Sequence, residues 1–293
     1  MAAPGMSAAG PSQGANYSPS RVSAAANAAS VGGTPITIPP TVEVGFARVT
    51  IVRVAIIIVL LAGWETLARS GLLFRDVVPT LGAIARALVT LLSQSDFYMN
   101  LGWTLGEIGL ALLIGGVSGL LVGLILGGSR FLGRAYEPYL YYLGPTPKII
   151  FFPVMIMWFG VGPTSKAALG ALSCFFPVAL STAAGMRQID AVLIRVGRSF
   201  RATTGQMVTK IYLPAMREPI VNGVRLGLGV AMIATLLAET KLSNRGIGYL
   251  IIQAYSTFDM PRMYAVLIAL FTLAIAANAF IGRFSTYRVT RAR

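Results

Sequence analysis

Histidine and cysteine, on which many catalytic and metal sites depend, are nearly absent from this chain. It has no histidine and one cysteine, Cys174, which excludes a histidine-based catalytic triad, a disulfide framework and a Cys/His zinc site. No Gly-x-x-x-x-Gly-Lys-Ser/Thr phosphate loop occurs, so the chain lacks that cradle for a nucleotide. The apolar segments also lack paired carboxylates and an activated nucleophile. We predict no catalytic residue, no metal site and no cofactor bound by this chain.

Lysine and glutamate side chains inside apolar segments could instead act on a solute. The segment 145–148 places two prolines and then Lys148 well inside an apolar run. An isolated cation at bilayer depth costs roughly 2.5–3.5 kcal/mol on insertion scales, so it usually faces a cavity or a partner. Our hypothesis is that Lys148 attracts an anionic substrate where Pro147 opens the helix, and that Glu239 lies on the same path. The alternative is that Lys148 snorkels to an interface or pairs with Glu107 or Glu239.

The composition indicates that these residues belong to a membrane protein. Of the 293 residues, 55% are hydrophobic and 12% are charged, against roughly 25% charged in a typical soluble domain. A helix that crosses a bilayer needs only ~20 apolar residues and leaves its surface in lipid. The net charge of +14 comes from Lys and Arg residues that lie between apolar runs rather than in one patch. This pattern favours anionic lipid over nucleic acid as a partner, so we predict an all-α membrane protein that binds no nucleic acid.

Six segments are apolar enough to cross the membrane, if Gly and Pro are allowed inside membrane helices. Residues 1–45 are rich in Ala, Ser, Gly and Pro, and this composition predicts a disordered cytoplasmic tail. We predict that residues 286–293 form a short basic cytoplasmic tail. Thr80 is expected to cap an amphipathic helix that ends near Leu92 and lies at the interface. The six spans, within a transmembrane domain expected at 46–285, lie near 49–68, 103–127, 135–158, 165–185, 219–238 and 263–282.

The basic residues predict the orientation, since Lys and Arg near helix ends are retained on the cytoplasmic side. The segment 187–218, between the fourth and fifth spans, is the longest polar interruption after the N-terminal tail, and it holds six of them. We therefore predict that this segment and both termini are cytoplasmic.

The second predicted span carries a glycine at every fourth residue. These four glycines, Gly115, Gly119, Gly123 and Gly127, fall on one stripe of a helix. Such a stripe lets another helix backbone approach closely, so we assign it to helix packing.

The segment 187–218 carries the most specific pattern. Its apolar residues recur at roughly helical spacing, which predicts two short amphipathic helices joined by a bend before Leu213-Pro214-Ala215. Here the chain resembles the permeases of bacterial ATP-binding-cassette (ABC) importers, in particular the nitrate, sulfonate, taurine and bicarbonate branch. In that family Glu-Ala-Ala, three residues, Gly and, a dozen residues later, Leu-Pro mark the coupling helix that docks into the ATPase.

The alignment to this coupling motif departs from the family at two positions. Counting back from Leu213-Pro214 aligns the family's glycine with Arg201; Gly205 would leave the spacing four residues short. The family's glutamate aligns with Arg195. The residues that we assign to ATPase coupling are Arg195, Val196, Gly197, Arg198, Ser199, Phe200, Arg201, Ala202, Leu213 and Pro214.

Further ordered matches over residues 60–255 carry the same resemblance. They lie at 158–162 after the third span, at 175–177 in the fourth, at 223–229 and 238–239 in the fifth, and at 246–251 in the outer loop. Several matches in order are less expected by chance than one.

This resemblance implies a type I ABC importer permease fold with about six membrane helices, in a bacterial inner membrane. It implies two ATPase subunits that bind ATP and Mg on the cytoplasmic face, a periplasmic or lipid-anchored substrate-binding protein outside, and a second permease copy in a homodimer. The branch implies import of a small anion of the sulfonate, nitrate, bicarbonate or organic-acid type. A stand-alone secondary transporter or channel is the alternative, and it would transport without ATPase partners.

Overall fold

A computed structural model describes residues 46–71 and 77–286, and these residues form helices and short connections. The tails predicted at 1–45 and 286–293 lie outside the described residues, apart from Thr286, which ends the last helix. In chain order the helices are α2 (Phe46–Ser70), α3 (Leu81–Leu92), α4 (Ser95–Gly128), α5 (Arg130–Leu143), the 3₁₀-helix η1 (Lys148–Phe151), α6 (Phe152–Phe159), α7 (Pro163–Arg187), α8 (Ala191–Ser199), α9 (Thr204–Met207), the π-helix η2 (Val208–Tyr212), α10 (Leu213–Ala215), α11 (Arg217–Lys241), α12 (Ile247–Ser256) and α13 (Met260–Thr286).

Five of these helices, α2, α4, α7, α11 and α13, are long and apolar enough to cross a bilayer. The stretch predicted as one span at 135–158 is not one continuous helix. It consists of α5 and the η1–α6 pair, which are bent by 91° at a short break. Pro145 and Pro147 lie in this break, and because proline has no backbone N–H and a fixed φ, the helical ladder cannot continue through it.

Helix α7 packs between α4 and α11, and glycines on both neighbours line the contacts. On α4, a Cβ at Gly119 would lie 2.7 Å from the carbonyl oxygen of Phe175, and one at Gly123 would lie 2.6 Å from that of Ala179. On α11, a Cβ at Gly227 would lie 2.8 Å from the sulfur of Cys174. Any side chain at these positions would push the backbones apart, so the glycines set the close spacing of the three helices.

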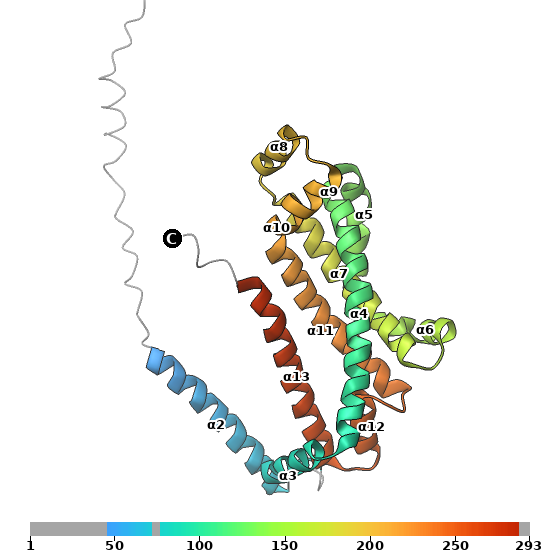
Figure 1. Ribbon diagram of the computed structural model, residues 1–293. Coiled ribbons are helices and arrows are strands. Elements are labelled where there is room, and N and C mark those ends of the chain that lie inside the picture. The colour runs from blue at the N-terminus through green and yellow to red at the C-terminus, as the bar shows by residue number, and fades with distance from the viewer. Residues whose placement is uncertain (1–45, 72–76, 287–293) are drawn as a thin grey trace, which may run out of the picture. The chain divides into compact units, whose positions relative to one another are not determined.

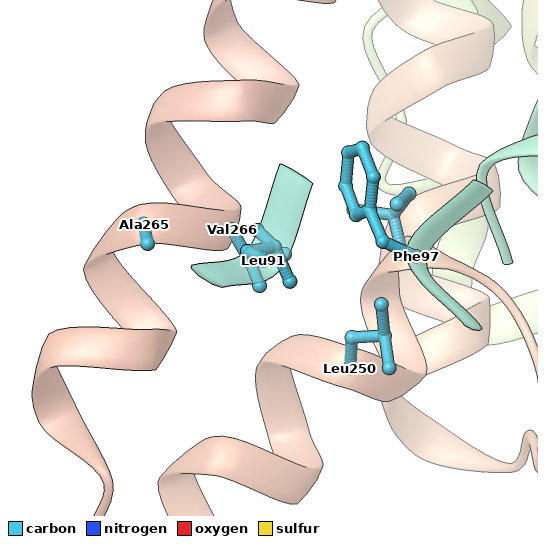
Figure 2. Close-up of a cluster of buried hydrophobic side chains, with 6 residues drawn as sticks. Leu91, Phe97, Leu250, Ala265 and Val266 are labelled. Carbon is cyan, nitrogen blue, oxygen red and sulfur yellow. The ribbon is translucent and has the colours of Figure 1, made fainter. Parts of the chain in front are cut away.

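The short helix α3 is anchored by an apolar cluster that it shares with α4, α12 and α13. Leu91, Phe97, Leu250 and Val266 are buried in this cluster, and Figure 2 shows Leu91 of α3 lying against Val266 of α13. The predicted N-cap of α3 is confirmed, because the Thr80 side chain accepts a hydrogen bond from the Ala83 N–H. With 12 residues α3 is too short to cross a bilayer, which needs ~20.

Within the bundle of α4, α7 and α11, the two ends carry different elements. Helices α8, α9 and α10 lie at one end, and α12 lies at the other (Figure 1). This separation places the segment that we predict to couple to the ATPase, within residues 187–218, at the first end and a cluster of buried polar side chains at the second.

Candidate functional site

Local capping interactions shape the predicted coupling segment, residues 187–218 between α7 and α11. The Asp190 side chain accepts a hydrogen bond from the Val192 N–H and begins α8. Thr203 and Gln206 form a capping box that begins α9, in which each side chain accepts from the other residue's backbone N–H. The bend predicted between two short amphipathic helices therefore lies at residues 200–203.

The outer face of α8 is apolar and has no partner within the described part of the chain. Val192, Leu193 and Val196 are exposed, and Phe200 directly after the helix is 83% exposed. Arg195 and Arg198 are exposed on the same helix. An exposed apolar patch that is rimmed by charged residues often marks a site of contact with another protein.

Gly197, near the end of α8, lets this helix pack closely against the segment that follows it. A Cβ at this buried position would lie 2.6 Å from the sulfur of Met207, so the absence of a side chain lets α8 lie against α9 and η2. Leu213 and Pro214 lie in α10, which follows η2 directly with helical backbone at Tyr212 and Leu213. The fully buried Met216 then fixes the junction with α11.

Arg201 adopts a backbone conformation that usually belongs to glycine. Its φ of +49° lies in the left-handed region, which costs an L-residue roughly 1–2 kcal/mol. This is the position that the motif alignment pairs with the family's glycine. Gly205, the other possible motif glycine, has an ordinary φ and open space around it.

Lys148 lies at the break between α5 and α6, buried to 8% exposure. Its ammonium group donates to the carbonyl oxygens of Gly144 at 2.5 Å, Thr146 at 3.3 Å and Leu143 at 3.4 Å. It also lies 4.6 Å from the ring centroid of Phe176. These contacts use the three donors of the ammonium group on backbone carbonyls around the break. The alternative partners Glu107 and Glu239 form no ion pair with it among the described residues.

Glu239 is fully buried and caps the N-terminus of α12. Its Oε2 accepts from the Gly248 N–H at 2.6 Å, and its Oε1 accepts from the Thr104 hydroxyl at 2.7 Å. Thr104 in turn accepts from the Ile247 N–H, and Asn100 accepts from the Gly246 N–H at 2.7 Å. Three side chains thus satisfy three N–H groups at the start of α12, a place that favours negative charge.

Two ion pairs, each with a buried carboxylate, went unassigned at the sequence level. Lys166, at the start of α7, lies 3.9 Å from Oε1 of Glu107 on α4. At the other end of the bundle, Arg187 pairs with the buried Glu137 of α5. The sequence does show these charged residues inside or beside apolar runs. It does not show which of them pair, because the partners lie far apart along the chain.

Comparisons with known proteins show the family to which this chain belongs. Residues 119–289, more than half of the chain, match the family of binding-protein-dependent transport system inner membrane components. This chain belongs to that family. The permease is 30% identical over 223 residues to the putative aliphatic sulfonates transport permease protein SsuC of Bacillus subtilis (strain 168), covering 76% of this chain and 81% of the relative.

A second relative is the taurine transport system permease protein TauC of Escherichia coli (strain K12), 30% identical over 210 residues, covering 70% of the permease and 76% of TauC. Among solved structures, a chain of the MetNI methionine ABC transporter in an inward-facing conformation matches with a TM-score of 0.54. That match has 20% identity and covers 70% of the permease and 95% of the MetNI chain, so it bears on the fold alone.

These findings confirm the predicted fold class and role. The permease is an all-α, multi-pass membrane protein with the fold of an ABC importer permease, and it is the membrane-spanning subunit of such an importer. Its family works with ATPase and substrate-binding components, and the permease itself is a transport subunit.

Proposed function

We propose that the permease forms the path for a small anion, and that separate ATPase subunits hydrolyse the ATP that drives transport. The substrate class is supported by the names of the relatives, which include aliphatic sulfonate, taurine and nitrate import permeases. The bound ATP and Mg would belong to the ATPase subunits.

The proposed orientation places the α8 end of the bundle in the cytoplasm, together with both termini. Arg130 and Arg134 of α5 and Arg187 of α7 lie around one cavity that also reaches Ile194 of α8, so basic residues from two helices gather at this end. Retention of basic residues on the cytoplasmic side supports this assignment. The α12 end then faces a periplasmic or lipid-anchored substrate-binding protein.

The observation that supports this proposal most directly is an exposed apolar patch at α8. The patch is formed by Val192, Leu193, Val196 and Phe200. Phe200, directly after α8 at the proposed cytoplasmic end, is 83% exposed, and covering it with a partner is favourable by about 25 cal/mol for each Å² of apolar surface removed from water. We assign this patch to the ATPase contact, so that closure of two ATPase subunits moves the α8 segments of two permease copies in a homodimer. Gly197 and the capped turn at residues 200–203 make α8 and α9 move together.

Co-purification with the co-expressed ABC ATPase and substrate-binding protein in mild detergent tests the proposal. Phe200→Ala should reduce recovery of the ATPase at least severalfold and abolish ATP-dependent uptake into proteoliposomes. Phe131→Ala is the matched control, because Phe131 is an equally exposed phenylalanine on α5. It should leave both readouts unchanged.

Two results would overturn the proposal. Full recovery of the ATPase with Phe200→Ala and with Val196→Ser would show that another surface makes the contact. Uptake driven by an ion gradient in the permease alone would favour a stand-alone transporter.

A further inference from the structure

A cavity of about 760 Å³ lies at the α8 end of the bundle, between α5 and the end of α7. The α5 wall consists of residues spaced three or four positions apart on one face of the helix: Arg130, Gly133, Arg134, Glu137, Pro138 and Tyr141. The opposite wall includes Met186 and Arg187 of α7. The volume falls within the ~300–1,000 Å³ that small-molecule sites usually enclose.

The α5 wall changes from basic to apolar along its length. Arg130 and Arg134 line the first two turns, and Pro138 and Tyr141 line the turns that follow. At a rise of 1.5 Å per residue, this wall is roughly 16 Å long from Arg130 to Tyr141. Helix α5 starts at the α8 end and leads back along the bundle toward α6 (Figure 1), so the apolar part of the wall lies deeper in the bundle than the arginines.

The position of the cavity along the bundle matches the boundary between lipid tails and headgroups. Helix α4 carries no charged residue over 108–128, and α5 begins directly afterwards with Arg130. Tyrosine collects at this boundary of a membrane, because its ring favours the apolar side and its hydroxyl favours water. Four tyrosines of α5 are more than half exposed: Tyr136, Tyr139, Tyr141 and Tyr142. The two arginines therefore lie at the depth of the headgroups.

The protein does not neutralise the positive charge of the cavity. Glu137, the carboxylate among the described lining residues, is buried and already pairs with Arg187. Arg130 and Arg134 are exposed and form no ion pair with any described residue. Three arginines and one glutamate thus leave two positive charges unmatched, and guanidinium groups bind phosphate oxygens with paired hydrogen bonds. The lining therefore favours a phosphate group.

Gly133 keeps the space between these arginines open. A Cβ at this buried position would lie 2.8 Å from the carbonyl oxygen of Leu126 and 3.7 Å from a terminal nitrogen of Arg187. The absence of a side chain lets the start of α5 lie against the end of α4, with Arg130 and Arg134 on either side of the glycine.

We propose that this cavity binds an anionic phospholipid, with the phosphate on Arg130 and Arg134 and the beginning of an acyl chain along Pro138 and Tyr141. The order of the α5 wall, basic and then apolar, matches the order of headgroup and tail, whereas a soluble phosphate would use the arginines alone. Basic pockets between membrane helices recur as binding sites for anionic lipid headgroups. Since Ile194 of α8 also reaches the cavity, the bound lipid would connect α5 and α7 with the predicted coupling segment.

Phosphatidylglycerol and phosphatidylcholine with the same acyl chains are suitable probes, since both carry a phosphate and only phosphatidylglycerol has a net negative charge. Mass spectrometry of the intact, full-length permease in detergent measures how much of each lipid stays bound. The unaltered permease should bind phosphatidylglycerol about tenfold more tightly, a difference of about 1.4 kcal/mol. The double variant Arg130→Gln, Arg134→Gln should lose this preference, and Arg130→Lys, Arg134→Lys should retain most of it.

A matched control separates this cavity from a general effect of charge. The double variant Arg217→Gln, Arg283→Gln also removes two exposed arginines, neither of which lines the cavity, and it should keep the preference for phosphatidylglycerol. Soluble glycerol phosphate in large excess tests the alternative source of a phosphate, and it should not displace the bound lipid. Size-exclusion chromatography of each variant checks that the protein is folded.

Equal binding of the two lipids to the unaltered permease would overturn the inference. Unchanged preference in Arg130→Gln, Arg134→Gln, or an equal loss in Arg217→Gln, Arg283→Gln, would also overturn it. Displacement by glycerol phosphate would show a site for a soluble phosphate instead of a lipid. None of these measurements involves ATP or a transported solute, so a negative result would leave the proposed transport function standing.

Discussion

The ammonium group of Lys148 donates a 2.5 Å hydrogen bond to the carbonyl oxygen of Gly144, across the break between α5 and α6. The lysine lies over the ring of Phe176 on α7, so one side chain ties the break to the central helix of the bundle. The cation that could have attracted a solute is thus also a donor to backbone carbonyls around the break. These two roles predict different consequences of removing the charge.

Lys148→Met is expected to lower the stability of the purified permease by about 2 kcal/mol, because the half-buried carbonyls of Gly144 and Thr146 lose a charged hydrogen-bond donor. Thermal unfolding in detergent measures this effect. Lys148→Arg should retain most of the stability, since a guanidinium can donate to the same carbonyls. A role in the substrate path would instead leave the unfolding temperature of Lys148→Met unchanged and raise the substrate concentration needed for half-maximal uptake.

Glu239→Gln is expected to loosen the start of α12. The amide has one oxygen, so either the Gly248 N–H or the Thr104 hydroxyl would face an NH₂ group, at a cost of about 1–3 kcal/mol for an unsatisfied buried group. Hydrogen–deuterium exchange of the amides at 246–250 should become faster.

Glu218→Gln is the control for this change, because Glu218 is an exposed glutamate in the first turn of the same helix α11. Unchanged exchange at 246–250 in Glu239→Gln would show that Asn100 and Thr104 suffice to hold α12.

Gly123→Ala is expected to destabilise the packing of α4 on α7 by about 2 kcal/mol or more. The new Cβ would lie 2.6 Å from the carbonyl oxygen of Ala179, and backbone atoms cannot move aside as a flexible side chain can. Gly116→Ala on the same helix has no atom within 4 Å and should be neutral or stabilising, since alanine has a higher helix propensity. Equal unfolding temperatures for the two variants would contradict the assigned role of the glycine stripe.

The sequence predicted well what depends on neighbours along the chain. Apolar runs of sufficient length indicated the helices that cross the membrane, and Thr80 marked the start of α3. The break at 145–148 was visible as two prolines, but its sharp bend was not, because the angle depends on the packing of α6 against α7.

Pairings across the fold were not predictable from one sequence. Thr104 and Glu239 are separated by 135 positions, and Asn100 and Gly246 by 146, so no spacing rule connects them. The pairing of Lys166 with Glu107 became visible only once α4 lay against α7. Gly223 and Gly227 of α11 also allow a close approach to α7. Their role could be recognised only once the packing of α11 on α7 was known.

Arg201→Gly is expected to stabilise the turn after α8 by about 0.5–1 kcal/mol. Glycine adopts the left-handed conformation at φ +49° without steric cost, and part of that gain is offset by its greater freedom in the unfolded chain. Slower hydrogen–deuterium exchange at 199–204 measures the gain. Arg201→Ala should give none, because alanine pays the same steric cost as arginine, and Gly205→Ala should be tolerated in open space. If Gly205→Ala weakened ATPase recovery while Arg201→Gly changed neither exchange nor recovery, the coupling motif would have to be realigned on Gly205.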